Sequence, residues 1–377
     1  MPGLHRYNNA VALDEGATSF EGRLVALIPA HNEAEGILVA LEALAAQTRV
    51  PDRVIVIADN CDDDTAERAR GWGAEVVVTV GNRSKKAGAL NQVLATLLTT
   101  LLDGDVVLVQ DADSFLDEGF IDGGLAALDH DPGLGAVGGT FRGKPAPPGS
   151  SWRERLLTHL QDNEYARYAR DVRRLRGRCL VVTGTAAMSR AGTLREVSQA
   201  RMTGRLPAGD GRGGVYDTSV LTEDNELSFA MMTLGRTILA PRGMTLTTEV
   251  MPTLRQLSSQ RLRWTRGAVE NCFQYGFTRV TAGYWGRQAL TAVGILVTAV
   301  YLTTLVYALA VHAFHLSPFW ASLTLVFVLE RFVTLKDKGW KAQLTAASMY
   351  ELPYDLFIQA TQARAYAHAL FRRTKNW

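Results

Sequence analysis

The fold is decided by the stretch Val106-Val107-Leu108-Val109-Gln110-Asp111-Ala112-Asp113, which lies in a chain of 377 residues. Four apolar residues followed by acids are typical of a buried strand that ends at a polar edge. Alternate residues of an extended chain point the same way, so the carboxylates of Asp111 and Asp113 should face one side. Two carboxylates so close are costly without a cation, and Mg²⁺ uses one or two carboxylates plus substrate phosphates. The stretch therefore predicts a buried strand with a divalent-cation site at its end.

Similar apolar runs occur on both sides of this strand and alternate with helical stretches. The expected strands are Leu24–Ile28, Arg53–Ala58, Glu75–Val80, Val106–Val109 and Ala136–Thr140, and the expected helices are Glu33–Ala46, Asp64–Gly71 and Ala87–Leu102. This alternation predicts an α/β fold with a mostly parallel sheet that is covered on both faces. Ligands of such sheets bind at the carboxyl ends of the strands.

Composition narrows the class of protein. The chain has 40 basic and 38 acidic residues and a net charge of +2, so bulk charge does not indicate nucleic-acid binding. Cys61, Cys179 and Cys272 lack metal-ligand spacing and cannot form a disulfide framework, which indicates a reducing compartment. The polar segment 1–22 has no apolar core, so no cleaved signal peptide is expected.

An uncharged stretch between Arg287 and Glu330 is long enough for two membrane spans, because one span needs about 20 apolar residues. We expect a helical hairpin over about 289–335. Basic residues flank the hairpin but are absent from its turn, which predicts that both ends face the cytoplasm. Two buried helices of a soluble bundle, or a hairpin that dips into one leaflet, remain alternatives. The aromatic and basic tail 339–377 predicts either interfacial helices or a helix packed on the catalytic domain.

Further motifs follow in a definite order along the chain. The turn P-A-H-N-E (Pro29–Glu33) comes after the first strand, and Asp59 ends the second. K-A-G-A-L-N (Lys86–Asn91) and T-E-D (Thr222–Asp224) each open a helical run, and Q-R-L-R-W (Gln260–Trp264) precedes the uncharged stretch. With the D-x-D acids, these motifs resemble the membrane-associated, inverting family 2 glycosyltransferases over roughly residues 22–377. The resemblance implies a GT-A-like nucleotide-sugar-binding domain.

The resemblance also assigns a donor site. A carboxylate at the end of a strand, such as that of Asp59, can accept the N–H of a uracil ring, which favours a UDP-sugar. Arginine forks suit diphosphate oxygens. The residues implied in donor binding are Ala30, Glu33, Asp59, Lys86, Asp111, Arg261 and Arg263, and those implied in holding Mg²⁺ or Mn²⁺ are Asp113 and Asp111.

On the acceptor side, the family's general base corresponds to Asp224, and a carboxylate suits this role because it can take a proton in the transition state. Trp264 offers a flat face for an acceptor sugar ring. Val181–Ala187 resembles the family's acceptor-side strand and turn, with an ordinary buried strand as the alternative. Glu226 is expected on the helix surface. The residues implied in acceptor binding are Gly184, Thr185, Glu223, Gln260 and Trp264.

The expected domains are a polar segment (1–22), a nucleotide-sugar-binding half (23–145), an acceptor-binding and catalytic half (146–279) and a membrane-associated helical region (280–377). We expect one or a few sugars to be transferred to a lipid, glycan or protein hydroxyl at the cytoplasmic face of the cell membrane. Processive polymer synthases of the family usually carry more membrane helices, but a homo-oligomer would leave that activity open. A sugar-nucleotide pyrophosphorylase and a non-catalytic membrane scaffold are the alternatives from other classes.

Overall fold

The computed structural model describes residues 20–312, 317–335 and 339–371. The chain divides into two compact units, one of residues 1–144 and 171–249 and the other of residues 145–170 and 250–377. Most of the expected polar segment 1–22, the centre of the expected hairpin turn and the last six residues of the tail lie outside the described residues. The division into compact units does not show which residues bind the donor, the acceptor or the membrane. The expected boundaries of those functional domains therefore stay a prediction.

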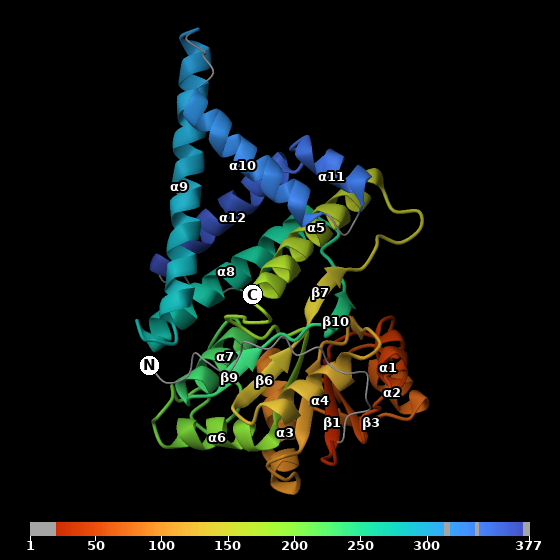
Figure 1. The fold of residues 1–377 in the computed structure, drawn as a ribbon. Helices are drawn as coiled ribbons and strands as arrows, with labels where there is room; N and C mark the ends of the chain where they lie inside the picture. Colours follow the sequence, from red (N-terminus) through yellow and green to blue (C-terminus); the bar gives the residue numbers. More distant parts are fainter. Residues whose placement is uncertain (1–19, 313–316, 336–338, 372–377) are drawn as a thin grey trace. The chain divides into compact units, whose positions relative to one another are not determined.

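A seven-stranded sheet forms the centre of the first unit, in the order β3-β2-β1-β4-β8-β6-β9 (Figure 1). The strands are β1 (Leu24–Ala30), β2 (Arg53–Ala58), β3 (Glu75–Val78), β4 (Val106–Gln110), β6 (Leu134–Gly138), β8 (Ala186–Arg190) and β9 (Thr237–Leu239). The five expected strands are present, with ends within two residues of the prediction. Strand β8 runs antiparallel to both β4 and β6, so the sheet is mixed, with parallel pairs in the majority.

A second, three-stranded sheet has the order β5-β10-β7. It is formed by β5 (Ser114–Leu116), β7 (Thr140–Gly143) and β10 (Thr245–Thr248). Because β5 begins directly after Asp113, this sheet fixes the chain on the far side of the D-x-D acids while β4 fixes it on the near side.

Helices cover the large sheet. They are α1 (Ile37–Ala45), α2 (Thr65–Trp72), α3 (Lys85–Thr100), α4 (Phe120–His130), α6 (Ala191–Met202) and α7 (Glu223–Thr233). The buried β1 side chains Leu24, Ala26 and Ile28 lie in one cluster with Leu41 of α1 and Phe120 of α4. Their spacing of two residues is the period of a strand whose one face packs on helices. The predicted α/β layering is therefore confirmed.

Of the expected strand and turn at Val181–Ala187, only the last two residues belong to a strand, β8, so the alternative of an ordinary buried strand is wrong for most of the segment. The N–H of Val182 donates to Ser228 Oγ at 3.0 Å, and the N–H of Gly184 donates to Asp224 Oδ2 at 2.8 Å. Since these donors bind side chains of α7, they cannot take part in a strand ladder. The segment forms a turn instead, and this turn belongs to the candidate site.

The second unit is helical. Its elements are α5 (Trp152–Arg174), which begins in this unit, α8 (Leu254–Tyr275), α9 (Ala282–Ala310), α10 (Pro318–Thr334), α11 (Trp340–Ala347) and α12 (Leu352–Leu370). Helices α5, α8 and α12 share a small core in which Leu157, Leu160, Leu257 and Tyr354 are buried. The helix α12 of the expected tail thus packs on α8.

Among the described residues, α9 is the one helix long and apolar enough to cross a membrane, and no residue of its apolar window is buried. Helix α10 has 17 residues. The two helices meet where the rings of Tyr301 and Trp320 lie 4.8 Å apart, and they diverge from that end (Figure 1). Two helices therefore form where the hairpin was expected, while their entry into a membrane stays a prediction.

The charged residues near the end of α10 are paired within the second unit. Arg331 Nη1 lies 2.7 Å from Glu351 Oε2, and the same oxygen accepts from Arg167 at 2.7 Å. Glu330 Oε1 lies 2.9 Å from Arg170 Nη1. Helix α10 is thus tied at this end to α5 and to the start of α12.

Candidate active site

The D-x-D acids lie at the polar end of β4. The N–H of Asp111 donates to the carbonyl of Thr185 at 2.9 Å, which fixes the acid beside the turn that precedes β8. Asp113 Oδ1 accepts a hydrogen bond from Ser114 Oγ at 3.2 Å. Both acids stand where the α/β architecture places ligands.

Lys86, in the first turn of α3, links these acids to the T-E-D turn. Its Nζ lies 2.5 Å from Asp111 Oδ1 and 2.9 Å from the carbonyl oxygen of Gly184. Glu223 Oε1 is 3.8 Å away. One ammonium group thus joins α3, the end of β4, the turn before β8 and the start of α7.

Asp224 completes this arrangement. Its Oδ2 accepts the N–H of Gly184 at 2.8 Å, and its Oδ1 accepts the N–H of Asn225 at 2.8 Å. A Cβ atom at Gly184 would lie 3.2 Å from Asp224 Oδ2 and 3.3 Å from Lys86 Nζ. Because residue 184 is a glycine, the turn can approach both side chains closely. The sequence predicted only an acceptor contact for Gly184 and not this packing role.

Electrostatics shift the titration of these groups. Burial raises the pKa of Asp224 to about 6, and the negative charge of Glu223 adds to the rise. Burial likewise raises the pKa of Asp111 to about 6, although Lys86 opposes the shift. Burial alone would lower the pKa of Lys86, but Asp111 and Glu223 hold it above its ordinary value. Lys86 therefore stays charged at neutral pH. Asp111 and Asp224 take up protons at a pH closer to neutral than ordinary aspartates do.

The residues fit a divalent cation. Burial raises the pKa of Asp113, and the negative charges of Glu33 and Glu249 raise it further, so a cation would relieve this site. No group of three or more metal-ligating side chains occurs in the part of the chain that the structure describes. Because Mg²⁺ commonly uses one or two carboxylates with substrate phosphates, Asp113 and Asp111 suffice if a diphosphate completes the shell.

The predicted nucleoside residues lie at the ends of β1 and β2. Asp59 Oδ1 accepts hydrogen bonds from Thr79 Oγ1 at 2.7 Å and Asn82 Nδ2 at 2.8 Å. Within the described residues no hydrogen bond to the other oxygen, Oδ2, is present. Ala30 is buried, and its carbonyl accepts the N–H of Asp59 at 2.8 Å, while Glu33 lies in the next turn and has a pKa raised by burial and by Glu249.

The same edge of the sheet carries unusual backbone conformations. Asn32 follows β1, Asn60 follows β2 and Lys85 begins α3, with φ values of 57°, 50° and 51°. Residues other than glycine seldom adopt positive φ, and such strain clusters at functional sites. The backbone therefore points to the same edge of the sheet as the side chains.

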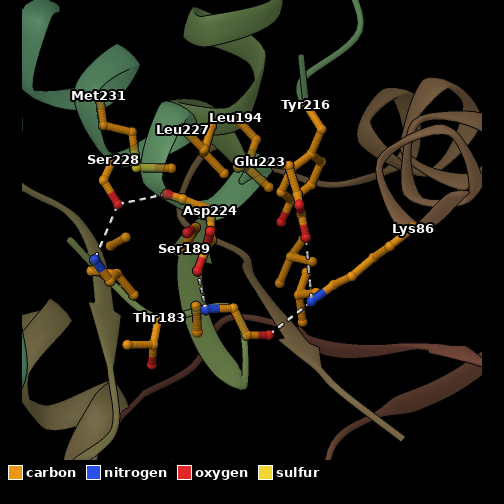
Figure 2. A pocket seen from close by; sticks show the side chains of 16 residues that line it. Lys86, Thr183, Ser189, Leu194, Tyr216, Glu223, Asp224, Leu227, Ser228 and Met231 are labelled. Carbon is orange, nitrogen blue, oxygen red and sulfur yellow. Dashed lines mark hydrogen bonds and ion pairs between the residues drawn. The ribbon is translucent and has the colours of Figure 1, made fainter. Parts of the chain in front are cut away.

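Lys86, Glu223 and Asp224 line a pocket in the first unit, and Tyr216 lines it with them (Figure 2). Tyr216 was not among the site residues predicted from the sequence. It belongs to the glycine-rich stretch before α7. Its N–H donates to Asn91 Oδ1 at 2.9 Å, and Asn91 Nδ2 donates to its carbonyl at 2.8 Å. Asn91 is the last residue of the K-A-G-A-L-N motif. Its presence in the motif was the sequence feature that could have indicated a contact with a distant loop.

Two other expectations on this side have different outcomes. Glu226 was expected on the helix surface, which is wrong: its carboxylate is fully buried and lies 2.5 Å from Arg201. Helix α7 is buried nearly all round, so it has few exposed positions. The Oγ1 atoms of Thr185 and Thr183 lie 3.0 Å apart in the turn before β8, and acceptor contact by Thr185 stays a prediction.

The Q-R-L-R-W residues belong to α8 of the second unit. Arg261 is buried, and its Nη2 lies 3.0 Å from Glu164 Oε2. Arg263 is exposed, and no ion pair or hydrogen bond to it is present among the described residues. Gln260 Oε1 accepts from Arg261 Nη1 at 2.7 Å, and Trp264 is partly exposed. Their predicted contacts with donor and acceptor stay predictions.

Known proteins resemble this chain in sequence or in fold. The poly-beta-1,6-N-acetyl-D-glucosamine synthase of Staphylococcus aureus (strain COL) is 26% identical over 274 residues, which cover 70% of this chain and 59% of that protein. The chain thus spans less than two thirds of the length of the curated relatives it matches. A mannosyltransferase from Pyrobaculum calidifontis, solved in complex with GDP-Man and Mn²⁺, shares the fold with a TM-score of 0.60 and 19% identity, covering 94% of this chain and 89% of that chain.

A family model covers most of the chain. Residues 22–267 match the model described as "Glycosyltransferase like family 2". The match begins just before β1 and ends within α8, so it includes the D-x-D acids, the T-E-D turn and the Q-R-L-R-W residues. The predicted GT-A-like α/β fold is confirmed by the structural likeness. This chain belongs to glycosyltransferase family 2 and is an enzyme of that family.

Proposed function

We propose that this enzyme transfers one or a few sugars, with inversion, from a nucleotide-sugar donor to a hydroxyl group of a lipid, glycan or protein. The observation that carries the proposal is the double contact of Lys86 Nζ with Asp111 and Gly184. It brings the D-x-D acids and the T-E-D turn into one site at the strand ends of a glycosyltransferase fold.

Asp224 acts as the general base. An acceptor hydroxyl gives its proton to Asp224 while its oxygen forms a bond to the anomeric carbon, and the bond from that carbon to the nucleoside diphosphate breaks on the opposite face. A pKa of about 6 leaves Asp224 ionised at neutral pH and still basic enough to take the proton. A single displacement inverts the anomeric centre and needs no enzymic nucleophile.

The proposed donor contacts use one unpaired oxygen, one exposed guanidinium and the D-x-D acids. Asp59 Oδ2 would accept the N–H of a uracil ring, which favours a UDP-sugar. Arg263 is exposed and suits the oxygens of the diphosphate. Asp113 and Asp111 would hold Mg²⁺ or Mn²⁺, and a bound ion neutralises the charge that develops on the leaving diphosphate.

The exposed apolar helix supports a place at the cell membrane. The 29 residues of α9 extend about 43 Å, more than the roughly 30 Å of a bilayer core. Trp285 and Tyr307 are separated by about 33 Å along this helix, so aromatic side chains would lie near both interfaces. Because Glu330 and Arg331 are paired inside the second unit, they need not enter lipid unpaired. We propose that α9 and α10 form a hairpin with the catalytic unit on the cytoplasmic side.

Processive polymer synthesis is the second candidate, and the likeness to the S. aureus synthase favours it. The two activities differ in product length at excess donor. A ladder of long chains that forms before the acceptor is consumed would identify the synthase, whereas a product extended by one or a few sugars would identify the transferase.

Removal of divalent metal should abolish transfer, and Mg²⁺ or Mn²⁺ should restore it, because the acids hold the ion together with the diphosphate. Asp113→Asn should weaken Mn²⁺ binding measured by calorimetry in the presence of UDP. Full turnover in chelator would rule out this part of the mechanism.

Replacing the base should separate turnover from donor binding. Asp224→Asn should lower turnover by about 10²–10⁴-fold with little change in UDP affinity, since the amide cannot accept the proton. Asparagine has one acceptor oxygen where Asp224 uses two, so the variant should unfold at a somewhat lower temperature, and turnover should be measured below it. The matched control is Asp129→Asn, at an exposed position on α4, which should change neither turnover nor UDP affinity. Near-normal turnover of Asp224→Asn would exclude it as the base.

The pH profile should report the same group. At saturating metal, activity should fall about tenfold per unit as pH drops below about 6, because Asp224 becomes protonated there. Glu223→Gln removes a negative charge that raises the pKa of Asp224, so the midpoint should move to lower pH. A midpoint that stays fixed or rises in Glu223→Gln would contradict this assignment.

Membrane association should depend on the exposed surface of α9. The full chain should sediment with membranes and require detergent for extraction, and Leu296→Arg with Val300→Arg should move it to the soluble fraction, since charges in lipid are costly. Recovery of the wild-type chain as a detergent-free monomer would contradict membrane association and support the alternative of two buried helices in a soluble bundle.

A further inference from the structure

The two arginines of Q-R-L-R-W lie in opposite environments on α8. The Arg261 side chain is only 5% exposed and pairs with Glu164 of α5. Arg263, two residues later, is exposed and free of such contacts among the described residues. Of these two arginines, Arg263 is the one that can meet a ligand without first breaking an ion pair.

Three helices meet at one carboxylate oxygen. Glu164 Oε2 accepts from Arg261 Nη2 of α8 at 3.0 Å and from the hydroxyl of Tyr354 of α12 at 2.5 Å. Tyr354 is 5% exposed and lies in the small core shared by α5, α8 and α12. We call Glu164, Arg261 and Tyr354 the Glu164 clamp.

The clamp also fixes the tryptophan of the motif. The guanidinium carbon of Arg261 lies 4.4 Å from the centre of the Trp264 ring and 5.6 Å from that of Tyr165. A cation over an aromatic face is attracted to it, most strongly when water is excluded. If Arg261 left to bind a diphosphate, Glu164 would lose its cation and Trp264 its stacking partner. The pair joins a buried guanidinium to a carboxylate that is 30% exposed, and breaking it would leave the guanidinium without its carboxylate partner, which costs stability.

We propose that Arg261 is a positioning residue, which holds the Trp264 ring in place through the Glu164 clamp and connects α12 to the motif. Arg263 is then the arginine of the motif that meets the diphosphate. The inference rests on the proposed function for the roles of Arg263 and Trp264. It gives Arg261 a different role from the donor contact expected from the sequence.

The test uses the full chain in detergent, with UDP and Mn²⁺ as the probe. The clamp variants are Arg261→Gln, Glu164→Gln and their combination; Arg263→Gln tests the diphosphate contact, and Arg255→Gln, exposed on the first turn of α8, is the neutral control. The readouts are UDP affinity, thermal unfolding and the fluorescence of Trp264, taken as the difference between each protein and the same protein with Trp264→Phe.

Both single clamp variants should unfold at lower temperature and share one altered Trp264 spectrum, because each breaks the same contact. The double variant should lose less stability than the sum of the two single losses, since the two variants remove the same ion pair. UDP affinity should stay within about twofold in these variants and fall about tenfold or more in Arg263→Gln. Arg261→Lys should restore part of the stability but not the Trp264 spectrum, because an ammonium cannot stack as a guanidinium does.

The inference is overturned if Arg261→Gln weakens UDP binding while Glu164→Gln does not, which is the result for a direct diphosphate ligand. Additive losses of thermal stability in the double variant, or an unchanged Trp264 spectrum, would also overturn it. Failure of the wild-type chain to bind any nucleoside diphosphate would count against the proposed function, whereas the stability and fluorescence readouts would still decide the clamp.

Discussion

The contact of the Lys86 ammonium with Asp111 and Gly184 is the constraint on which the site depends. A charge withdrawn from water must be paired and hydrogen-bonded, and the acceptors here come from separate elements. The start of α3, the end of β4 and the turn before β8 must therefore stay in register. Through Gly184 this register also fixes Asp224, so the proposed base and Asp111, one of the two proposed metal ligands, are positioned by one network.

The features predictable from the sequence are those that depend on local pattern. Buried strands such as Val106–Gln110 and the acids that follow them are evident from apolar runs and polar ends. The resemblance indicated a strand and a turn before β8 but not the partners of the turn, because Val182 and Gly184 donate to side chains 46 and 40 residues away. Tyr216 was missed because its partner, Asn91, lies 125 residues earlier in the chain. Long-range hydrogen bonds decide such segments, and no local pattern encodes them.

The Q-R-L-R-W motif and the apolar helices illustrate the same limit. Apolar length is a property of one uninterrupted segment, so hydropathy alone predicts the position of α9. Two arginines in one motif look alike in the sequence, and only the position of Glu164 on α5 distinguishes Arg261 from Arg263. The buried pair of Glu226 with Arg201 likewise depends on a helix that precedes it by a long loop.

Single displacement assisted by Asp224 is tested most directly by the anomeric configuration of the product. NMR of the transferred sugar, formed from an α-linked UDP-sugar that the enzyme accepts, gives this configuration without assumptions about binding. Attack opposite the leaving diphosphate predicts a β-linked product. An α-linked product would contradict the mechanism, because retention requires a second displacement through an enzymic nucleophile or a front-face attack.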